Sequence, residues 1–468
     1  MDSAQAYQKC LKRLTWATES LKLDISQPQL EQIADLIVQP MTGPWRFFHT
    51  PQHIFEVGGS KDPIEVIAAL FHDLVYVQVD WSINFNVGYY ISPFAKEING
   101  RLTIRSQSDL PVDTTFAIVA NVFGFIPGQV LNPYAGQNEF LSALVAAKVL
   151  EPFVKAPLLM QIVACIEATI PFRSPCEKGL TVSEQLLQRL QSTNEKFNLL
   201  ITDAELCETV KRGVRVANRD VCSFAHPSAA RFLANTWNLL PETNHNLSTS
   251  GAYTVADYRL AIQKMENFMA SLKPEVVFRS FQGEPNCHTY KILEYYLRRN
   301  IEIAQLYLKS KLVTIALIEA ISFAIGLDIP LVIMMGEVPL RGFTFMRLEH
   351  FLPEVINPYE PQTLTEKEVW NILKFGRAKS NYSDLQHSPI ATFIVKSIGF
   401  DAVQKQCELA KQFFLGNISS EEFICSFDNC VPEKIIDALQ ALFESRKIAV
   451  SHCYKFTSNH HNQHQLHD

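Results

Sequence analysis

The feature that most constrains this chain is a polar pair inside an apolar run. Residues 66–77 read VIAALFHDLVYV, and only His72 and Asp73 interrupt the apolar side chains. A run that is apolar nearly all round predicts a buried helix. Burying an imidazole beside a carboxylate costs several kcal/mol unless both groups find partners, and a metal ion satisfies both. The run therefore predicts a metal centre, the alternative being a purely structural hydrogen-bonded pair in a core.

Elsewhere the dominant period is helical. Apolar residues recur at spacings of three and four over 206–225, and 286–326 is a long stretch rich in leucine, isoleucine and tyrosine. Residues 143–170 predict two helices that are split near Pro157. We expect an all-α protein.

The chain of 468 residues is longer than one hydrophobic core usually organises, so at least two domains are expected. Residues 81–137 are rich in glycine, proline and aromatic residues, and they predict an irregular insertion or lid in a first domain, 1–245. The polar, turn-rich segment 241–251 predicts the boundary. A helical C-terminal region, 252–468, follows, with a further break predicted at 353–363 and a last helix starting near Pro432.

One segment, 312–335, is apolar over more than twenty residues. It contains Glu319 and Asp328, which are costly in lipid, so we expect a core helix that breaks near Gly326 and Pro330 and no membrane partner.

Composition narrows the class of function. Hydrophobic residues make up 47% of the chain and charged residues 19%, and the net charge of -6 offers no broad cationic surface for nucleic acid. The scattered cysteines and the absence of a secretory signal at the start predict a cytoplasmic protein. No Gly-Lys-Ser/Thr phosphate loop and no Gly-x-Ser-x-Gly elbow occurs, so nothing supports an ATPase or a serine hydrolase.

A pair of histidines precedes the His-Asp doublet. In residues 48–54, FHTPQHI, Thr50 can cap a helix and Pro51 suits its first position, so His53 would lie in the first turn and His49 just before it. His72 follows His53 by 19 residues, which is about the length of a loop and a second helix packed beside the first. The two motifs can therefore converge on one cavity.

These motifs resemble those of the HD-domain metal-dependent phosphohydrolases. Residues 48–54 are similar to the Tyr-His-x-x-x-His-hydrophobic signature of small bacterial predicted members, and 71–76, FHDLVY, are similar to their His-Asp motif. The resemblance implies a helical HD-domain bundle. It covers about 45–225 in pieces.

The resemblance continues beyond the insertion. Asn138 and Glu139 begin NEFLSA, similar to the family's Asn-Glu-x-x-Ser-Ala, and Thr169 ends IEAT, similar to Ile-x-Ala-Thr. Phe172 stands where the family commonly has a histidine, which favours one metal over two.

The distal aspartate of the family is best matched by Asp220. On its expected helix this residue flanks the apolar stripe, and a carboxylate at a buried edge needs a partner. The alternative is a salt bridge with Arg215 or Arg219.

By this resemblance, one divalent metal (Mn, Fe, Mg or Zn) would be held by His53, His72, Asp73 and Asp220. The related His-x-x-x-His element of cyclic-nucleotide phosphodiesterases implies that His49 protonates the leaving oxygen. Glu139 would orient the attacking water, with Asn138 and Thr169 as supports, although a carboxylate in the first turn of a helix is favoured by the helix dipole anyway. The expected substrate is a nucleotide or another small phosphate ester.

Two further interpretations concern the role of the whole chain and its C-terminal tail. The chain can be a catalytically degenerate HD domain that acts as a ligand-binding or regulatory module, with 252–468 as its partner-binding half. The histidine-rich tail, 459–468, predicts disorder with adventitious metal affinity rather than a built site.

Overall fold

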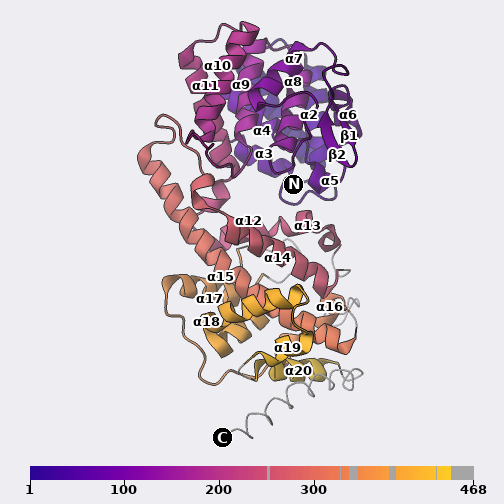
Figure 1. The fold of residues 1–468 in the computed structure, drawn as a ribbon, viewed down its shortest axis with the longest axis vertical. Helices are drawn as coiled ribbons and strands as arrows, with labels where there is room; N and C mark the ends of the chain where they lie inside the picture. The colour runs from indigo at the N-terminus through magenta and orange to yellow at the C-terminus, as the bar shows by residue number, and fades with distance from the viewer. Residues whose placement is uncertain (250–252, 327, 337–345, 379–385, 428–429, 444–468) are drawn as a thin grey trace. The chain divides into compact units, whose positions relative to one another are not determined.

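The computed structural model describes the chain except for residues 250–252, 327, 337–345, 379–385, 428–429 and 444–468, and except for the side chains of 324 and 325. The described part is all-α, as predicted, with one two-stranded hairpin (Figure 1). The histidine-rich tail lies outside the described residues.

Two compact units make up the fold, and each combines two stretches of chain. The first contains residues 1–225 and 272–295, and the second contains 226–271 and 296–468. This division differs from the predicted one, 1–245 and 252–468. Residues 229–243 form helices that pack with the second unit, whereas 272–295 returns to the first, where Phe281 joins the hydrophobic core and Glu284 pairs with Arg215.

The elements of the first unit are α1 (Ser3–Ser20), α2 (Gln27–Met41), α3 (Pro51–Val57), α4 (Pro63–Phe71), α5 (Val77–Asp80), α6 (Phe85–Ile91), β1 (Ala95–Ile98), β2 (Arg101–Ile104), α7 (Thr114–Phe123), α8 (Gln137–Leu150), α9 (Ala156–Ala168), α10 (Val182–Phe197), α11 (Asp203–Asp220) and the 3-10 turns η1 (Cys222–Ala225) and η3 (Pro274–Val276). The predicted split between two helices near Pro157 is confirmed by α8 and α9.

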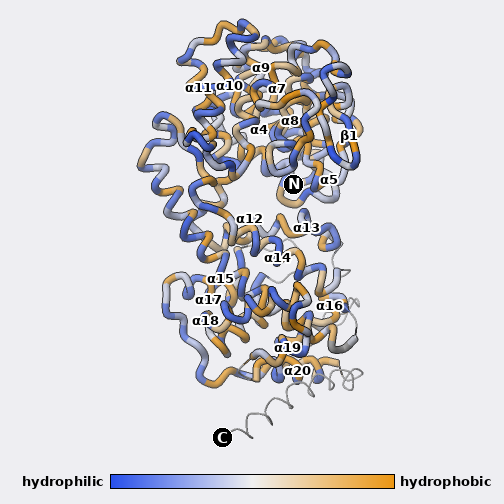
Figure 2. The backbone as a smooth tube through the Cα atoms, viewed as in Figure 1, coloured by the Kyte–Doolittle hydropathy of each residue, from blue (hydrophilic) through white to orange (hydrophobic). Residues whose placement is uncertain are grey.

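Three helices form the centre of the first unit. Helix α9 packs against α4, α8 and α11, and α4, α8 and α9 are apolar along most of their length (Figure 2). Helix α11 is amphipathic and ends at Asp220, followed by η1, so the helix predicted over 206–225 is interrupted at residue 221.

The segment 81–137 is more regular than predicted. It contains α6, α7 and the antiparallel hairpin β1–β2, whose strands pair Ala95 with Ile104. Phe94 and Phe116 stack with ring centroids 4.6 Å apart and belong to the main core. These two aromatic side chains therefore anchor the segment in the core.

The second unit contains α12 (Ala229–Trp237), α13 (Leu240–Thr243), η2 (His245–Ser248), α14 (Val255–Ser271), α16 (Leu331–Met334), η4 (Leu348–Phe351), α17 (Leu364–Phe375), α18 (Pro389–Phe414), α19 (Ser420–Cys425) and α20 (Val431–Leu442). Helix α15 (Cys287–Ile325) begins in the first unit's stretch of chain and ends in the second's. Its end at Ile325, before Gly326 with φ +107°, confirms the predicted break, and Pro432 lies at the start of α20 as expected.

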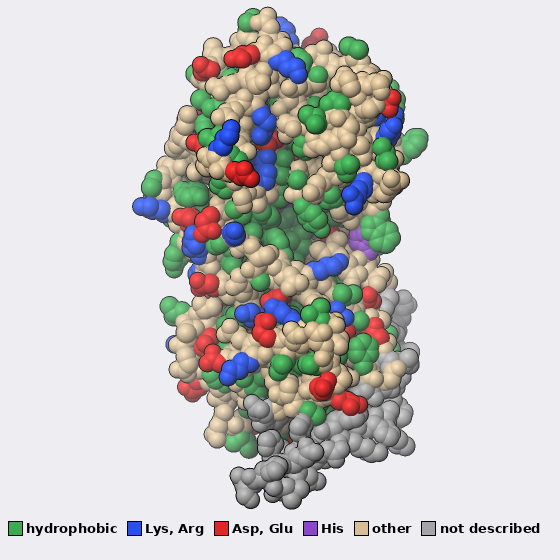
Figure 3. Space-filling model, in the orientation of Figure 1, with side chains coloured by type: hydrophobic (Ala, Val, Ile, Leu, Met, Phe, Trp, Pro, Cys, Tyr) green, Lys and Arg blue, Asp and Glu red, His purple; other side chains and the backbone are tan. Residues whose placement is uncertain are grey.

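The described surface is mixed in charge. On the face in Figure 3, basic and acidic side chains are interspersed rather than gathered by sign. None of the described helices combines the length and the apolar character needed to cross a membrane.

Candidate metal centre

His53 reaches the centre from the first turn of α3. Thr50 precedes the helix with extended backbone, Pro51 opens it, and the His53 amide donates to the Thr50 carbonyl at 3.0 Å. This is the helix start that the sequence predicted. Proline at this position loses no hydrogen bond, because the first amides of a helix have no partner within it.

The His-Asp doublet lies at the end of α4 rather than inside a helix. Asp62 caps the start of α4 by accepting from the Ile64 amide at 2.9 Å, and the helix ends at Phe71 with His72 as its C-terminal cap. Successive side chains of an α-helix point about 100° apart, so a helix continuing to residue 77 would separate the two groups. The turn at Asp73 lets both side chains reach one point.

One hydrogen bond orients His72. Its Nδ1 lies 2.8 Å from the Ala69 carbonyl oxygen, which can only accept, so Nδ1 carries the proton and donates. Nε2 therefore faces the centre with its lone pair when the ring is neutral. Metal-binding histidines are commonly fixed in this way through their second nitrogen.

Asp220 is brought to the centre by the anchoring of α11. Arg215 and Arg219, one turn apart on this helix, both bind the buried Glu65 of α4, and Arg219 Nε also donates to the Val57 carbonyl at 2.6 Å. Both arginines predicted as alternative partners of Asp220 are thus engaged by Glu65. Gly213 permits close packing on α9, since a Cβ there would lie 2.8 Å from the Ala168 Cβ.

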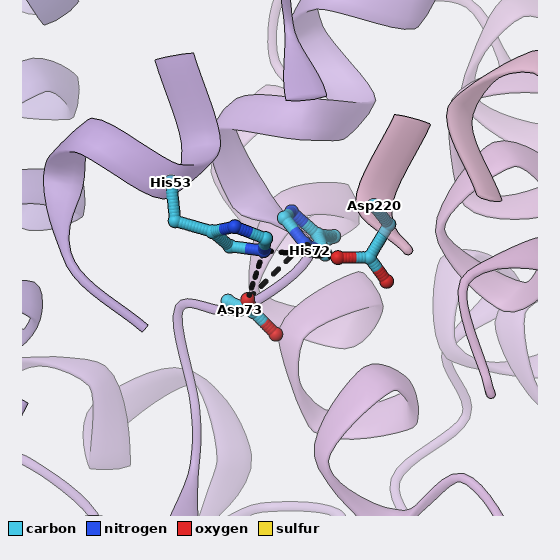
Figure 4. Close-up of side chains that lie close together, drawn as sticks. All are labelled: His53, His72, Asp73 and Asp220. Atoms are coloured by element: carbon cyan, nitrogen blue, oxygen red, sulfur yellow. Dashed lines mark hydrogen bonds and ion pairs between the residues drawn. The ribbon is translucent and has the colours of Figure 1, made fainter. Parts of the chain in front are cut away.

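The four side chains point to one place from three separate parts of the chain (Figure 4). His53 Nε2 lies 2.9 Å from Asp220 Oδ1 and 3.3 Å from Asp73 Oδ2. His72 Nε2 lies 3.1 Å from Asp73 Oδ2 and 3.4 Å from Asp220 Oδ1. With metal–ligand distances of about 2.1 Å, neighbouring ligand atoms lie about 3.0 to 3.4 Å apart in octahedral or tetrahedral geometry. The spacing of the cluster therefore suits one divalent ion.

Two atoms of this cluster lack hydrogen bonds. His72 Nε2 and Asp73 Oδ2 are buried, and neither has a hydrogen-bond partner despite their proximity. Buried polar atoms without partners are rare and need a physical reason. A cation coordinated by both atoms supplies one, so the residues present fit a metal.

The electrostatics of the metal-free centre are those of two ion pairs. Burial opposes the charge on His53, yet the neighbouring carboxylates of Asp220 and Asp73 raise its pKa to about 9, and they also raise the pKa of His72. Burial likewise works against ionised Asp220, but His53 and His72 lower its pKa to about 2. Metal binding must therefore displace protons from the imidazoles.

His49 lies beside the centre. Its ring is 6.0 Å from the His53 ring and 4.3 Å from the Tyr76 ring, measured between centroids. Although burial alone would raise the pKa of Asp73, His72 and His49 lower it well below its ordinary value. His49 is thus an electrostatic neighbour of the cluster without being one of its four ligand candidates.

Glu139 is the other titratable group predicted for the site. Its Oε2 is buried without a hydrogen-bond partner, and burial, together with Asp73 and Asp220, raises its pKa to about 7. A carboxyl group with this pKa can accept a proton near neutral pH.

The two predicted supporting residues differ in what they contact. Asn138 accepts a hydrogen bond from the Val77 amide at 3.2 Å and so holds the loop that follows the doublet. Ser142, one turn along α8, accepts from the Val75 amide at 3.0 Å. Thr169 instead donates to the Ile166 carbonyl at 2.8 Å, within its own helix.

Arg46 is the positioning residue that sequence reasoning missed. Its buried guanidinium pairs with both oxygens of Asp80, at 2.7 and 2.8 Å, and donates to the Asp73 carbonyl at 2.9 Å. It also reaches the His49 carbonyl at 3.4 Å and thereby links the two histidine motifs. The available signal was an arginine set among aromatic residues, WRFF at 45–48, where a charge must find a buried partner.

Phe172 offers no ligand. Its ring packs 5.8 Å from that of Phe224, measured between centroids. In the part of the chain that the structure describes, His53, His72, Asp73 and Asp220 are the group that could hold a metal.

Comparison with known proteins does not assign this chain to a family. No protein-family model matches the chain, and neither a curated protein nor a solved structure matches it.

Proposed function

We propose that this chain is a metal-dependent phosphohydrolase of the HD-domain type. The observation that carries the proposal is the convergence of His53, His72, Asp73 and Asp220 within 4.8 Å of one another, with two ligand atoms left without hydrogen bonds. The resemblance of the motifs in the sequence supports the reaction class.

The donor set favours a transition metal. Two imidazole nitrogens and two carboxylate oxygens suit Mn, Fe or Zn better than Mg, which prefers oxygen ligands and keeps several waters. When bound, such an ion supplies Lewis acidity toward a phosphoryl oxygen and toward water.

The surrounding residues can manage the protons of hydrolysis. Water attacks phosphorus while the ester P–O bond breaks, and the water loses one proton to Glu139, whose pKa of about 7 suits an acceptor. His49, in its imidazolium form, gives one proton to the leaving alkoxide oxygen. The products are an alcohol and a phosphate, and both side chains must then exchange protons with solvent.

The test uses the full-length protein purified without a histidine tag. We expect about one equivalent of transition metal by elemental analysis, and metal-dependent turnover of a panel of phosphate esters. Asp73→Ala should lose both. Asp109→Ala should keep both, because Asp109 is an exposed carboxylate paired with Lys96.

Absence of bound metal after reconstitution with Mn, Fe and Zn would contradict the proposal. Metal binding without turnover of any ester would instead favour the degenerate, ligand-binding alternative.

A further inference from the structure

A buried arginine from a distant part of the sequence lies next to this centre. Arg279 is 8% exposed and belongs to the segment 272–295, which returns to the first unit. Its amide donates to Asn218 Oδ1 at 2.8 Å, and its carbonyl accepts from Asn218 Nδ2 at 2.9 Å. Asn218 lies two residues before Asp220 on α11, so the same helix end positions Asp220 and the backbone of Arg279.

The guanidinium of Arg279 is only partly used. Among the described residues it donates to the Ile170 carbonyl, which occupies one of its two terminal nitrogens. A guanidinium carries five N–H donors in a rigid fork. A side chain more than nine-tenths buried therefore retains donors that no described protein group accepts.

Several charged side chains lie around Arg279. Glu167 is fully buried, and its Oε1 accepts from both Arg173 and Arg189 at 2.5 Å. Arg279 interacts electrostatically with both Arg173 and Glu167. Burial and the like charge of Arg173 lower the pKa of Arg279 to about 9, although the opposite charge of Glu167 acts to raise it. Arg173 and Arg189 thus occupy Glu167 Oε1, and Asp220 and Glu139 are the other carboxylates within electrostatic reach of Arg279. A buried guanidinium with unused donors indicates a place for an anion.

Arg279 is also close to the metal centre. Asp220 and Glu139 are both electrostatic neighbours of Arg279, while Asp73, Asp220 and Arg173 are neighbours of Glu139. Glu139 is therefore an electrostatic neighbour of both the four-residue cluster and the arginines. We expect a ligand bound at the cluster beside Glu139 to reach Arg279.

We propose that Arg279, with Arg173 beside it, binds the phosphoryl oxygens of the substrate and selects a dianionic phosphate monoester. This inference rests on the proposed function and names its substrate class. A monoester offers three terminal phosphoryl oxygens, enough to reach the metal and both guanidiniums, whereas a diester offers two. Arginine is suited to this task because its planar fork binds two phosphate oxygens at once.

The experiment measures binding of inorganic phosphate and of dimethyl phosphate to the metal-loaded, full-length protein by titration calorimetry. The variants are Arg279→Lys, which keeps the charge but loses the fork, and Arg279→Gln, which loses both. Arg212→Gln is the matched control, because Arg212 is a partly buried arginine of the same unit, held by Asp62 away from the cluster. Thermal unfolding of each variant checks the fold, and phosphomonoesterase KM and kcat are measured in parallel.

We expect phosphate to bind the parent protein at least tenfold more tightly than dimethyl phosphate. Arg279→Gln should weaken phosphate binding at least tenfold and raise KM more than it lowers kcat, Arg279→Lys should fall between, and Arg212→Gln should match the parent. Unchanged phosphate binding in a folded Arg279→Gln, or no phosphate binding by the parent, overturns the inference. Equal binding of the two probes overturns the monoester assignment. If phosphate binding depends on Arg279 but no ester is hydrolysed, the proposed hydrolase fails and the anion site stands.

Discussion

Helices α4 and α11 meet through two polar contacts of opposite character. In the first, Glu65 is 1% exposed and its two oxygens are fully engaged, with Arg215 at 2.5 Å, Arg219 at 2.8 Å and Ser60 at 2.7 Å. In the second, Asp220 meets His72 at the end of α4, and His72 Nε2 and the adjacent Asp73 Oδ2 lack hydrogen-bond partners. The same helix pair thus carries one contact that is complete and one that is not.

This difference distinguishes a purely structural contact from a contact that can bind a ligand. Arginines remain charged in proteins and match a carboxylate in geometry, so the Glu65 contact satisfies itself and fixes the two helices. Histidines can lose their protons and present lone pairs, so the second contact can accept an ion from solution. The complete contact holds the incomplete one in position.

The largest difference in stability is expected when one carboxylate is removed from each contact. In the metal-free protein, Glu65→Gln should cost about 3 to 5 kcal/mol of folding free energy, because Glu65 is buried and two partly buried guanidiniums lose their counter-charge. Asp220→Asn should cost clearly less above pH 7, since His53 and His72 can respond by losing protons. Hydrogen–deuterium exchange of α4 and α11 peptides measures both, and equal losses of protection would refute the distinction.

The second contact should make the stability of the protein depend on pH. In the metal-free protein the raised pKa of His53, about 9 against 6.5, gives a stabilising contribution that is complete below pH 6.5 and is lost as pH rises through 9. The lowered pKa of Asp220, about 2 against 3.8, gives a contribution that is lost as pH falls through 2. The shift of His53 corresponds to roughly 3 kcal/mol.

The affinity for a divalent metal should increase from pH 6 to 9, because a metal can bind the imidazoles only after they lose their protons. Proton release on metal addition, measured by calorimetry in buffers of different ionisation enthalpy, checks this. A pH-independent affinity with no proton release would contradict the ion-paired description of the centre.

Arg46 offers a smaller change that leaves all four ligand candidates in place. Arg46→Met should weaken metal binding about 10- to 100-fold, the usual effect of losing a residue that orients ligands. Arg105→Met is the control, because Arg105 donates to the Ser92 carbonyl away from the centre. A chelator competition assay gives both affinities, and similar losses in the two variants would exclude a specific role for Arg46.

The smallest expected effect tests the packing that delivers Asp220. Gly213→Ala places a methyl group 2.8 Å from the Ala168 Cβ, so α9 and α11 must separate slightly. We expect a stability loss of about 1 to 3 kcal/mol from overpacking, with a decrease in metal affinity no larger than that of Arg46→Met. Gly88→Ala is the control, because the nearest atom to its added Cβ is 3.8 Å away.

Much of the local structure could be predicted from the sequence because helices are encoded by short-range patterns. The apolar period located the long helices, proline and threonine marked the start of α3, and Gly326 and Pro330 marked the end of α15. The prediction of a helix through the doublet was wrong in its end point, because apolar residues continue past Phe71 but α4 ends there. Periodicity alone does not reveal where a buried helix turns.

By itself, the sequence determined the helical class and the residue types that a metal requires. Tertiary structure decided which of them meet: His53 and Asp220 are 167 positions apart and come within 2.9 Å because α11 is held in place, by Glu65 through Arg215 and Arg219 and by the close packing of Gly213 on α9. It also decided that Arg279 belongs to the first unit, although its place in the sequence suggested the C-terminal region. The physical reason is that helix periodicity is local, whereas ligand convergence and charge balance depend on contacts between distant segments.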